Sequence, residues 1–158
     1  MENNHSNTEK KGMGYRKFAI TMGISFIVMY FIMFINIVDI NHFYISLNRI
    51  YMALLMVSPM AIIMLLMMGK MYPNKKMNKA IIIGSIVVFG VVLTALRTQT
   101  PVGDEQYMKA MIPHHSSAIM TSQNANIKDP EVRKLADDII KTQKKEIAEM
   151  KAILARMK

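Results

Sequence analysis

Three long uncharged stretches constrain this chain more than any other feature of its sequence. They cover residues 18–38, 50–68 and 80–96, and each is close to the length of a membrane-spanning α-helix. Backbone polar groups in lipid can find partners only within a helix or a closed barrel. The sequence therefore predicts an all-α protein that begins with three transmembrane helices.

The basic residues between these stretches predict the orientation in the membrane. The N-terminal arm, residues 1–17, and the loop before residue 80 each hold four Lys or Arg, whereas the first loop holds only Arg49. Because basic loops stay on the cytoplasmic side, we expect a multi-pass protein of the cell membrane with a cytoplasmic N-terminus. The predicted organisation is an arm, a three-helix transmembrane region, a linker and an extracytoplasmic domain, at residues 1–17, 18–96, 97–103 and 104–158.

The extracytoplasmic domain is predicted to be an antiparallel helical hairpin. Its second helix has a clear start, because Asp129 is suited to the N-cap and Pro130 to the first helical position. About 50 residues in two helices bury too little surface to be stable alone. We therefore expect a homodimer whose two hairpins complete a four-helix bundle. Packing of the hairpin on its own outer loop is the alternative, and it would leave a monomer.

Methionine and histidine residues on the first helix of this hairpin suggest a metal site. Asp104, Met108, Met111 and His115 follow an i, i+4, i+7, i+11 progression along one face, with His114 beside it. Thioethers suit Cu(I) or Ag(I), and imidazole binds either oxidation state of copper. The chain has no Cys, so Met and His are its soft ligands. In the alternative, Met fills gaps in a buried helix and the histidines only bind neighbouring side chains.

The second helix presents Gln143, Glu146 and Met150 on a single face. When the chain is folded about a turn near residue 128, both sets of candidate ligands lie at similar heights. The opposed pairs expected are His115 with Gln143, Met111 with Glu146, and Met108 with Met150. A metal, or a hydrogen bond to a ligand imidazole, would satisfy the polar Gln and Glu. A pair that only sets the register of the two helices remains the alternative.

These motifs resemble the domain of unknown function 305 family, over about the C-terminal third of the chain. The resemblance rests on Met-Ile-Pro-His-His at residues 111–115, followed by the spaced Gln143, Glu146 and Met150. It implies a fold similar to ferritin-like helical bundles and a relation to members implicated in copper binding. The family's motif residues fall on Asp104, Met108, Met111, His114, His115, Gln143, Glu146 and Met150. The chain departs from the family at Thr121, where a Met is common, and near Ile153, where a Trp is frequent.

Two further residues carry structural expectations. Pro113 inside a helix would remove one backbone hydrogen bond and kink the helix just before His114. The alternative is that the helix starts at Pro113 and that the preceding residues form an entry turn. His42, alone in the first outer loop, is expected to be solvated.

Taken together, the sequence predicts a membrane-anchored, extracytoplasmic protein that captures or buffers copper as Cu(I) or Cu(II), with a copper-handling protein as its partner. The alternative function is a metal-free helical module that binds a partner protein at the membrane surface. No enzymatic activity is predicted, although oxidation of bound metal stays open. No basic stripe is interleaved with stacking aromatic residues, so nucleic acid is not an expected partner.

Overall fold

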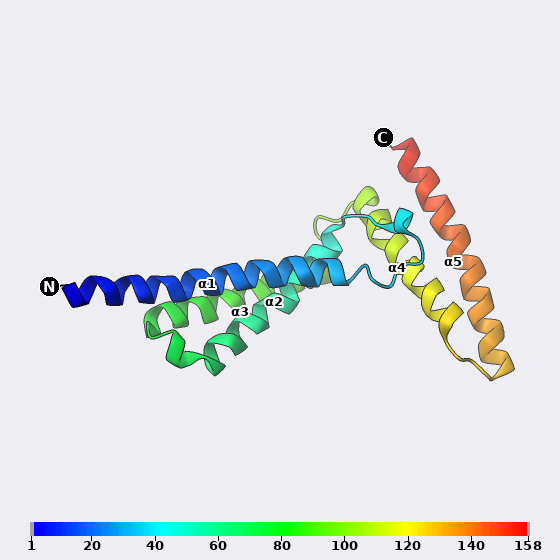
Figure 1. Ribbon diagram of the computed structural model, residues 1–158. Coiled ribbons are helices and arrows are strands. Elements are labelled where there is room, and N and C mark those ends of the chain that lie inside the picture. The colour runs from blue at the N-terminus through cyan, green and yellow to red at the C-terminus, as the bar shows by residue number, and fades with distance from the viewer. Residues whose placement is uncertain (1, 158) are drawn as a thin grey trace. The chain divides into compact units, whose positions relative to one another are not determined.

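The computed structural model describes residues 2–157, whose regular elements are all helices joined by loops; side chains are described for residues 14–157. No strand occurs in this range. Figure 1 shows the order of the elements. The five α-helices are α1 (Glu2–Ile32), α2 (Leu47–Met67), α3 (Lys75–Thr98), α4 (Asp104–Asn124) and α5 (Pro130–Arg156). Two short 3₁₀ helices, η1 (Ile40–His42) and η2 (Gly69–Met71), lie before and after α2.

The described residues form two compact units. The first contains residues 2–31 and 50–100, and the second contains residues 32–49 and 101–157. The sequence had placed the whole of residues 18–96 in the transmembrane region. In the structure, the connection between α1 and α2 belongs instead with α4 and α5.

Three helices are long and apolar enough to cross a membrane, as predicted. The spanning segments are Gly14–Ile32 in α1, Leu47–Met67 in α2 and Lys75–Thr98 in α3, and few of their residues are buried. The first helix differs from prediction at both ends. Residues 2–17, predicted as an arm, form its first turns, and it ends at Ile32 instead of continuing to Val38. The chain leaves the helix there because the following residues bind α4, as described below.

The first unit is held together at one end by aromatic and amide side chains. Phe18 and Leu65 are buried together with Tyr72. The hydroxyl of Tyr15 donates a hydrogen bond to Oδ1 of Asn78 at 2.7 Å, and Nδ2 of Asn78 donates to the Tyr72 carbonyl at 2.7 Å. These contacts join the start of the first spanning segment to the connection between α2 and α3.

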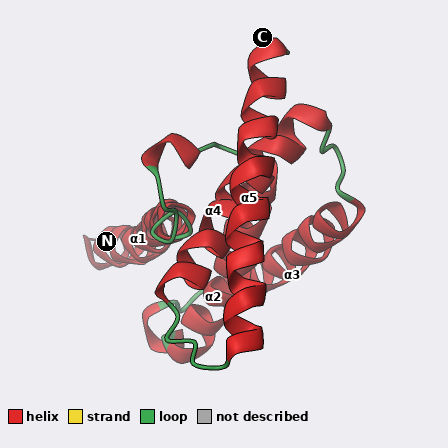
Figure 2. Ribbon diagram, turned by 90° about the vertical axis from the view of Figure 1, so that its right-hand side faces the viewer, coloured by secondary structure: helices red, strands yellow, loops and turns green. Residues whose placement is uncertain are grey.

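The second unit is built around α4 and α5, which lie side by side and antiparallel (Figure 2). The start of α5 has the predicted cap: Oδ1 of Asp129 accepts hydrogen bonds from the backbone N–H groups of Glu131 and Val132 at 2.9 and 3.0 Å. Pro130 follows as the first helical residue. Its missing N–H costs nothing at that position, so the sequence starts the helix sharply.

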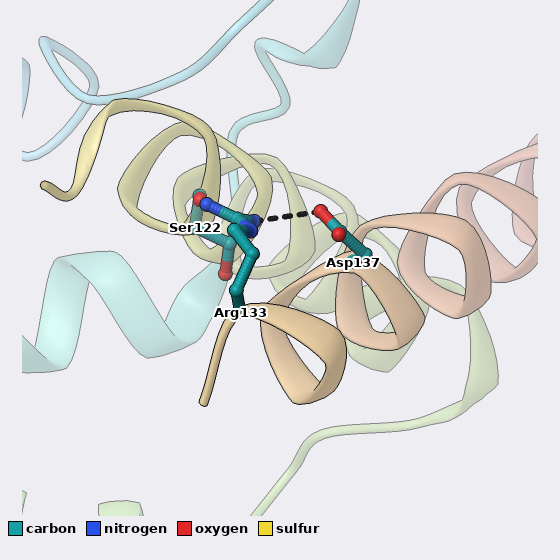
Figure 3. Close-up of polar contacts among 3 residues, drawn as sticks. All are labelled: Ser122, Arg133 and Asp137. Carbon is teal, nitrogen blue, oxygen red and sulfur yellow. Dashed lines mark hydrogen bonds and ion pairs between the residues drawn. The ribbon is translucent and has the colours of Figure 1, made fainter. Parts of the chain in front are cut away.

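An arginine joins the two helices next to their connection. Nη2 of Arg133 donates to the Ser122 carbonyl at 3.0 Å and forms an ion pair with Oδ1 of Asp137 at 2.8 Å, as Figure 3 shows. The Ser122 carbonyl lies in the last turn of α4, where carbonyls have no partner within the helix. Arg133 therefore satisfies an otherwise open acceptor and ties the end of α4 to the beginning of α5.

Candidate functional site

The helix that carries most of the candidate ligands, α4, is buried on two sides. Toward α5, its residues Met108, Ile112 and Ile119 form a core with Ile147 and Leu154. These α4 residues recur at the spacing of one helix face, which explains why that face packs on a neighbour. The other buried side faces the loop between α1 and α2, residues 33–46, through η1. The candidate site thus lies on a helix that is fixed from both sides.

His115 on α4 meets Glu146 on α5. Nδ1 of His115 lies 3.3 Å from a carboxylate oxygen of Glu146; the His115 side chain is 12 % exposed and that of Glu146 is 42 % exposed. The predicted register had placed Gln143 opposite His115, so the structure differs by three residues, less than one helical turn. Burial lowers the pKa of His115 below its ordinary value, and this effect outweighs the opposing influence of the Glu146 carboxylate. His115 is therefore neutral at pH 7, the form in which imidazole binds metals.

Two buried polar atoms beside this contact have no hydrogen-bond partner. They are Nδ1 of His115, which is not aligned for a hydrogen bond with the nearby Glu146 oxygen, and Oε1 of Gln143. An unsatisfied buried polar group costs about 1–3 kcal/mol. Such groups are expected where another molecule or ion completes the site. Their position on facing helices matches the candidate ligand face.

Three methionines border this face. Met108 is 6 % exposed and belongs to the core between α4 and α5. Met150 is half-buried and packs against the same core, and Met111 is half-buried on α4. Thioether sulfurs therefore lie in the largely apolar core of the same helix pair that carries the His115 imidazole. That combination of soft, uncharged donors suits Cu(I).

The remaining candidate ligands lie at the surface. His114 is exposed, and its ring centroid is 6.0 Å from that of His115, with the rings tilted by 60°. Asp104 is exposed in the first turn of α4. Both are accessible to an incoming ion, but neither shares the buried face between the helices. Pro113 lies inside α4 and is fully buried, so the alternative in which the helix begins at Pro113 is wrong.

No group of three or more His, Asp or Glu side chains suited to a metal occurs in the described part of the chain. The sequence also has no Cys. The soft or borderline donors that α4 and α5 carry are therefore thioether sulfur and imidazole. Magnesium and calcium prefer oxygen ligands instead.

The structure reveals polar contacts that the sequence did not predict. His42, which was expected to be solvated, is half-buried, and its Nδ1 lies 2.9 Å from Oγ of Ser116. The same oxygen accepts a hydrogen bond from the Val38 N–H at 2.8 Å. Ser116 is fully buried and directly follows His115. The only sequence signal for these contacts is the pair of serines after the two histidines, which interrupts a partly apolar helix.

The environment of His42 keeps its imidazole neutral. Burial lowers the pKa of His42, and the positive charge of Lys151 on α5 lowers it further, while the nearby Asp39 acts in the opposite direction. A neutral ring can accept the Ser116 hydroxyl proton at Nδ1, which leaves the Ser116 oxygen free to accept from Val38. All three groups are satisfied in this arrangement.

Comparisons with known proteins agree with the resemblance seen in the sequence. Residues 89–154 match the family model described as domain of unknown function (DUF305). The uncharacterized protein L153 of Acanthamoeba polyphaga mimivirus is 40 % identical over 114 residues, which cover 71 % of this chain and 73 % of that protein. Since an alignment of this length cannot fit within the family-model match, the similarity reaches into the spanning helices.

No solved structure matches this chain. The match to the family model and the extent of the similarity to the viral protein support the same assignment. The chain therefore belongs to the DUF305 family.

Proposed function

We propose that this chain is a membrane-anchored protein that captures or buffers copper outside the cytoplasm. The observation that carries the proposal is that α4 and α5 together hold His115, whose buried Nδ1 lacks a hydrogen-bond partner, and the buried or half-buried thioethers of Met108 and Met150. Met111 extends the same face. Copper is the cargo of this site, and the protein supplies its donors.

The donor set gives each residue a separate role. Met108, Met111, Met150 and His115 are the proposed ligands. Glu146 and Gln143 lie on the opposite helix and orient the imidazole or complete the site with oxygen. His114 and Asp104 are exposed, so they are suited to receiving the ion before it reaches the buried donors. Thioethers and imidazole bind Cu(I) as neutral donors, so the only charge added to the apolar interface is that of the ion.

The proposed location follows from charge and from the spanning helices. Three helices are apolar enough to cross a membrane, and the segments richest in Lys and Arg are residues 10–17 in α1 and residues 70–79, which end in the first turns of α3. By the positive-inside rule these segments are cytoplasmic, which puts α4 and α5 on the opposite side. A hairpin there would collect copper outside the cytoplasm and pass it to a copper-handling protein.

Competitive titration with Cu(I) and Cu(II) chelators tests the proposal on the full chain in lipid nanodiscs. The native protein is expected to bind copper stoichiometrically. Met111→Leu and His115→Ala should each weaken the binding, whereas Lys134→Ala should not, because Lys134 is exposed on α5 and is not a candidate ligand. Weak binding that none of these substitutions changes would refute the proposal and favour a helical module that binds a partner protein.

We also propose that two copies pair through α5. This helix carries Val132, Leu135 and Ile153 and is followed by Met157, and these four apolar residues are 38–60 % exposed. Because the chain has no Cys, Leu135→Cys introduces a single thiol that can form a disulfide only with a second copy. Oxidation is expected to crosslink Leu135→Cys but not the neighbouring Lys134→Cys, which lies about 100° around the helix. Equal crosslinking of both variants would contradict the dimer.

A further inference from the structure

Four hydrogen bonds connect one side of α4 to the segment that consists of the loop between α1 and α2 and the first residue of α2. Oγ of Ser116 accepts from the Val38 N–H at 2.8 Å and lies 2.9 Å from Nδ1 of His42. Oγ of Ser117 accepts from Nδ2 of Asn36 at 2.6 Å. At the beginning of α4, Oε1 of Gln106 accepts from the Leu47 N–H at 3.0 Å.

This side of α4 lies away from the candidate metal face. At 100° per residue, Ser116 and Ser117 are rotated by about 100° and 200° from His115 around the helix axis. The α5 helix contacts the face that carries His115, while the loop binds the serine side. Contacts on two separate sides restrain the rotation of a helix about its axis more strongly than contacts on one side alone.

Pro113 makes this external restraint important. A proline inside a helix removes the hydrogen bond to the carbonyl four residues earlier and loosens the helix at that point. Here Pro113 lies between Gln106, which binds the first residue of α2, and Ser116, which binds the loop. It is also fully buried. The segment from the loop to Leu47 therefore holds α4 on both sides of the turn that Pro113 loosens, immediately before the two histidines.

We propose that Ser116 is a positioning residue of the candidate site: through Val38 and His42 it anchors the loop to α4 and holds His115 toward Glu146. The inference rests on the proposed function only where it concerns copper. The positioning itself is a property of the metal-free protein. This positioning role makes the loop between α1 and α2 part of the candidate site. It also gives a function to the serine pair that follows the histidines.

The test compares Ser116→Ala with Ser122→Ala in the full chain in nanodiscs. Ser122 is a matched control because it lies on the same helix and contacts Arg133 through its backbone carbonyl, which alanine retains. Carbethoxylation by diethyl pyrocarbonate, located by mass spectrometry, reports the accessibility of His115, with the exposed His114 as an internal reference. Ser116→Ala should raise the rate ratio of His115 to His114 roughly fivefold or more, and Ser122→Ala should leave it unchanged.

A second variant keeps the inference testable if Ser116→Ala fails to fold. His42→Ala weakens the same anchor from the loop and leaves α4 intact, so it should raise the same ratio in the same direction. Cu(I) affinity, measured on the same samples, should fall at least about fivefold in both variants. An unchanged ratio in both variants would overturn the inference, as would a raised ratio with unchanged copper affinity. If the native protein binds no copper while the ratio still rises, the proposed function fails and the anchoring role of Ser116 stands.

Discussion

Replacement of Met108 separates its role in the core from its role as a ligand. Met108 is only 6 % exposed, and it packs with Ile112, Ile147 and Leu154. Met108→Ala therefore loses nearly the full transfer free energy of the side chain, about 1.5–3 kcal/mol, and adds a cavity term. The expected total is about 2–5 kcal/mol. Met108→Leu keeps the volume and the apolar surface, so its cost should stay below about 1.5 kcal/mol.

Copper affinity should respond to the two substitutions differently from stability. Both remove the sulfur, so both should weaken Cu(I) binding, although only the alanine variant is strongly destabilised. Urea unfolding of the second unit, followed by hydrogen exchange in nanodiscs, gives the stability, and chelator competition gives the affinity. A leucine variant that binds copper as tightly as the native protein would refute the ligand role of Met108 and leave it as a core residue.

Three other predictions concern the cap, the loop and the topology. Asp129→Ala removes the acceptor of two backbone N–H groups, so it should cost about 0.5–2 kcal/mol of stability, measured by urea unfolding, whereas Asp129→Asn should cost less. The pKa of His42 lies below its ordinary value of 6.5, so the unfolded loop binds more protons. Loop protection, measured by hydrogen exchange, should be full above about pH 6.5 and fall as the pH drops through and below it. His42→Ala should weaken this dependence and leave the part that comes from His115, whose pKa is also lowered. A membrane-impermeant maleimide should label Lys128→Cys on intact cells, but should label Lys75→Cys only after permeabilisation; the reverse pattern would invert the proposed topology.

The sequence predicted the elements whose physical signals are local. Uncharged length gave the spanning helices, and Asp129 followed by Pro130 gave the start of α5. The periodic Met108 and His115 indicated a face of α4 that packs on a neighbour, and Met108 does lie in the core. In each case a helix period, a cap or a length limit acts within a few residues of sequence, so no knowledge of the tertiary structure was needed.

The contacts between distant segments could not be predicted in the same way. Residues 33–46 bind α4 through single hydrogen bonds that Asn36 and Val38 donate and His42 accepts, and no periodic pattern marks such residues. The register between α4 and α5 was also uncertain by about one turn. Ala125 and Asp129 adopt extended conformations in the connection, and an extended residue advances about twice as far as a helical one. The length of the connection therefore cannot be inferred from residue number alone.

The loop contacts change how the module should be studied. The C-terminal segment alone would lack residues 32–49, which belong to the same compact unit as α4 and α5. A fragment without them would lose the partners of Ser116 and Ser117 and would expose their side of α4. Binding and stability measurements should therefore use the full chain. The exposed apolar residues of α5 would remain available for a second copy in either case.

X-ray absorption spectroscopy of the full chain loaded with one equivalent of Cu(I) tests the central claim most directly, because it reports the atoms bound to the metal. The account predicts a first shell that contains both sulfur from methionine and nitrogen from histidine, with less sulfur in Met108→Leu and less nitrogen in His115→Ala. A shell of oxygen and nitrogen alone, or a spectrum that neither substitution changes, would contradict a copper site between α4 and α5.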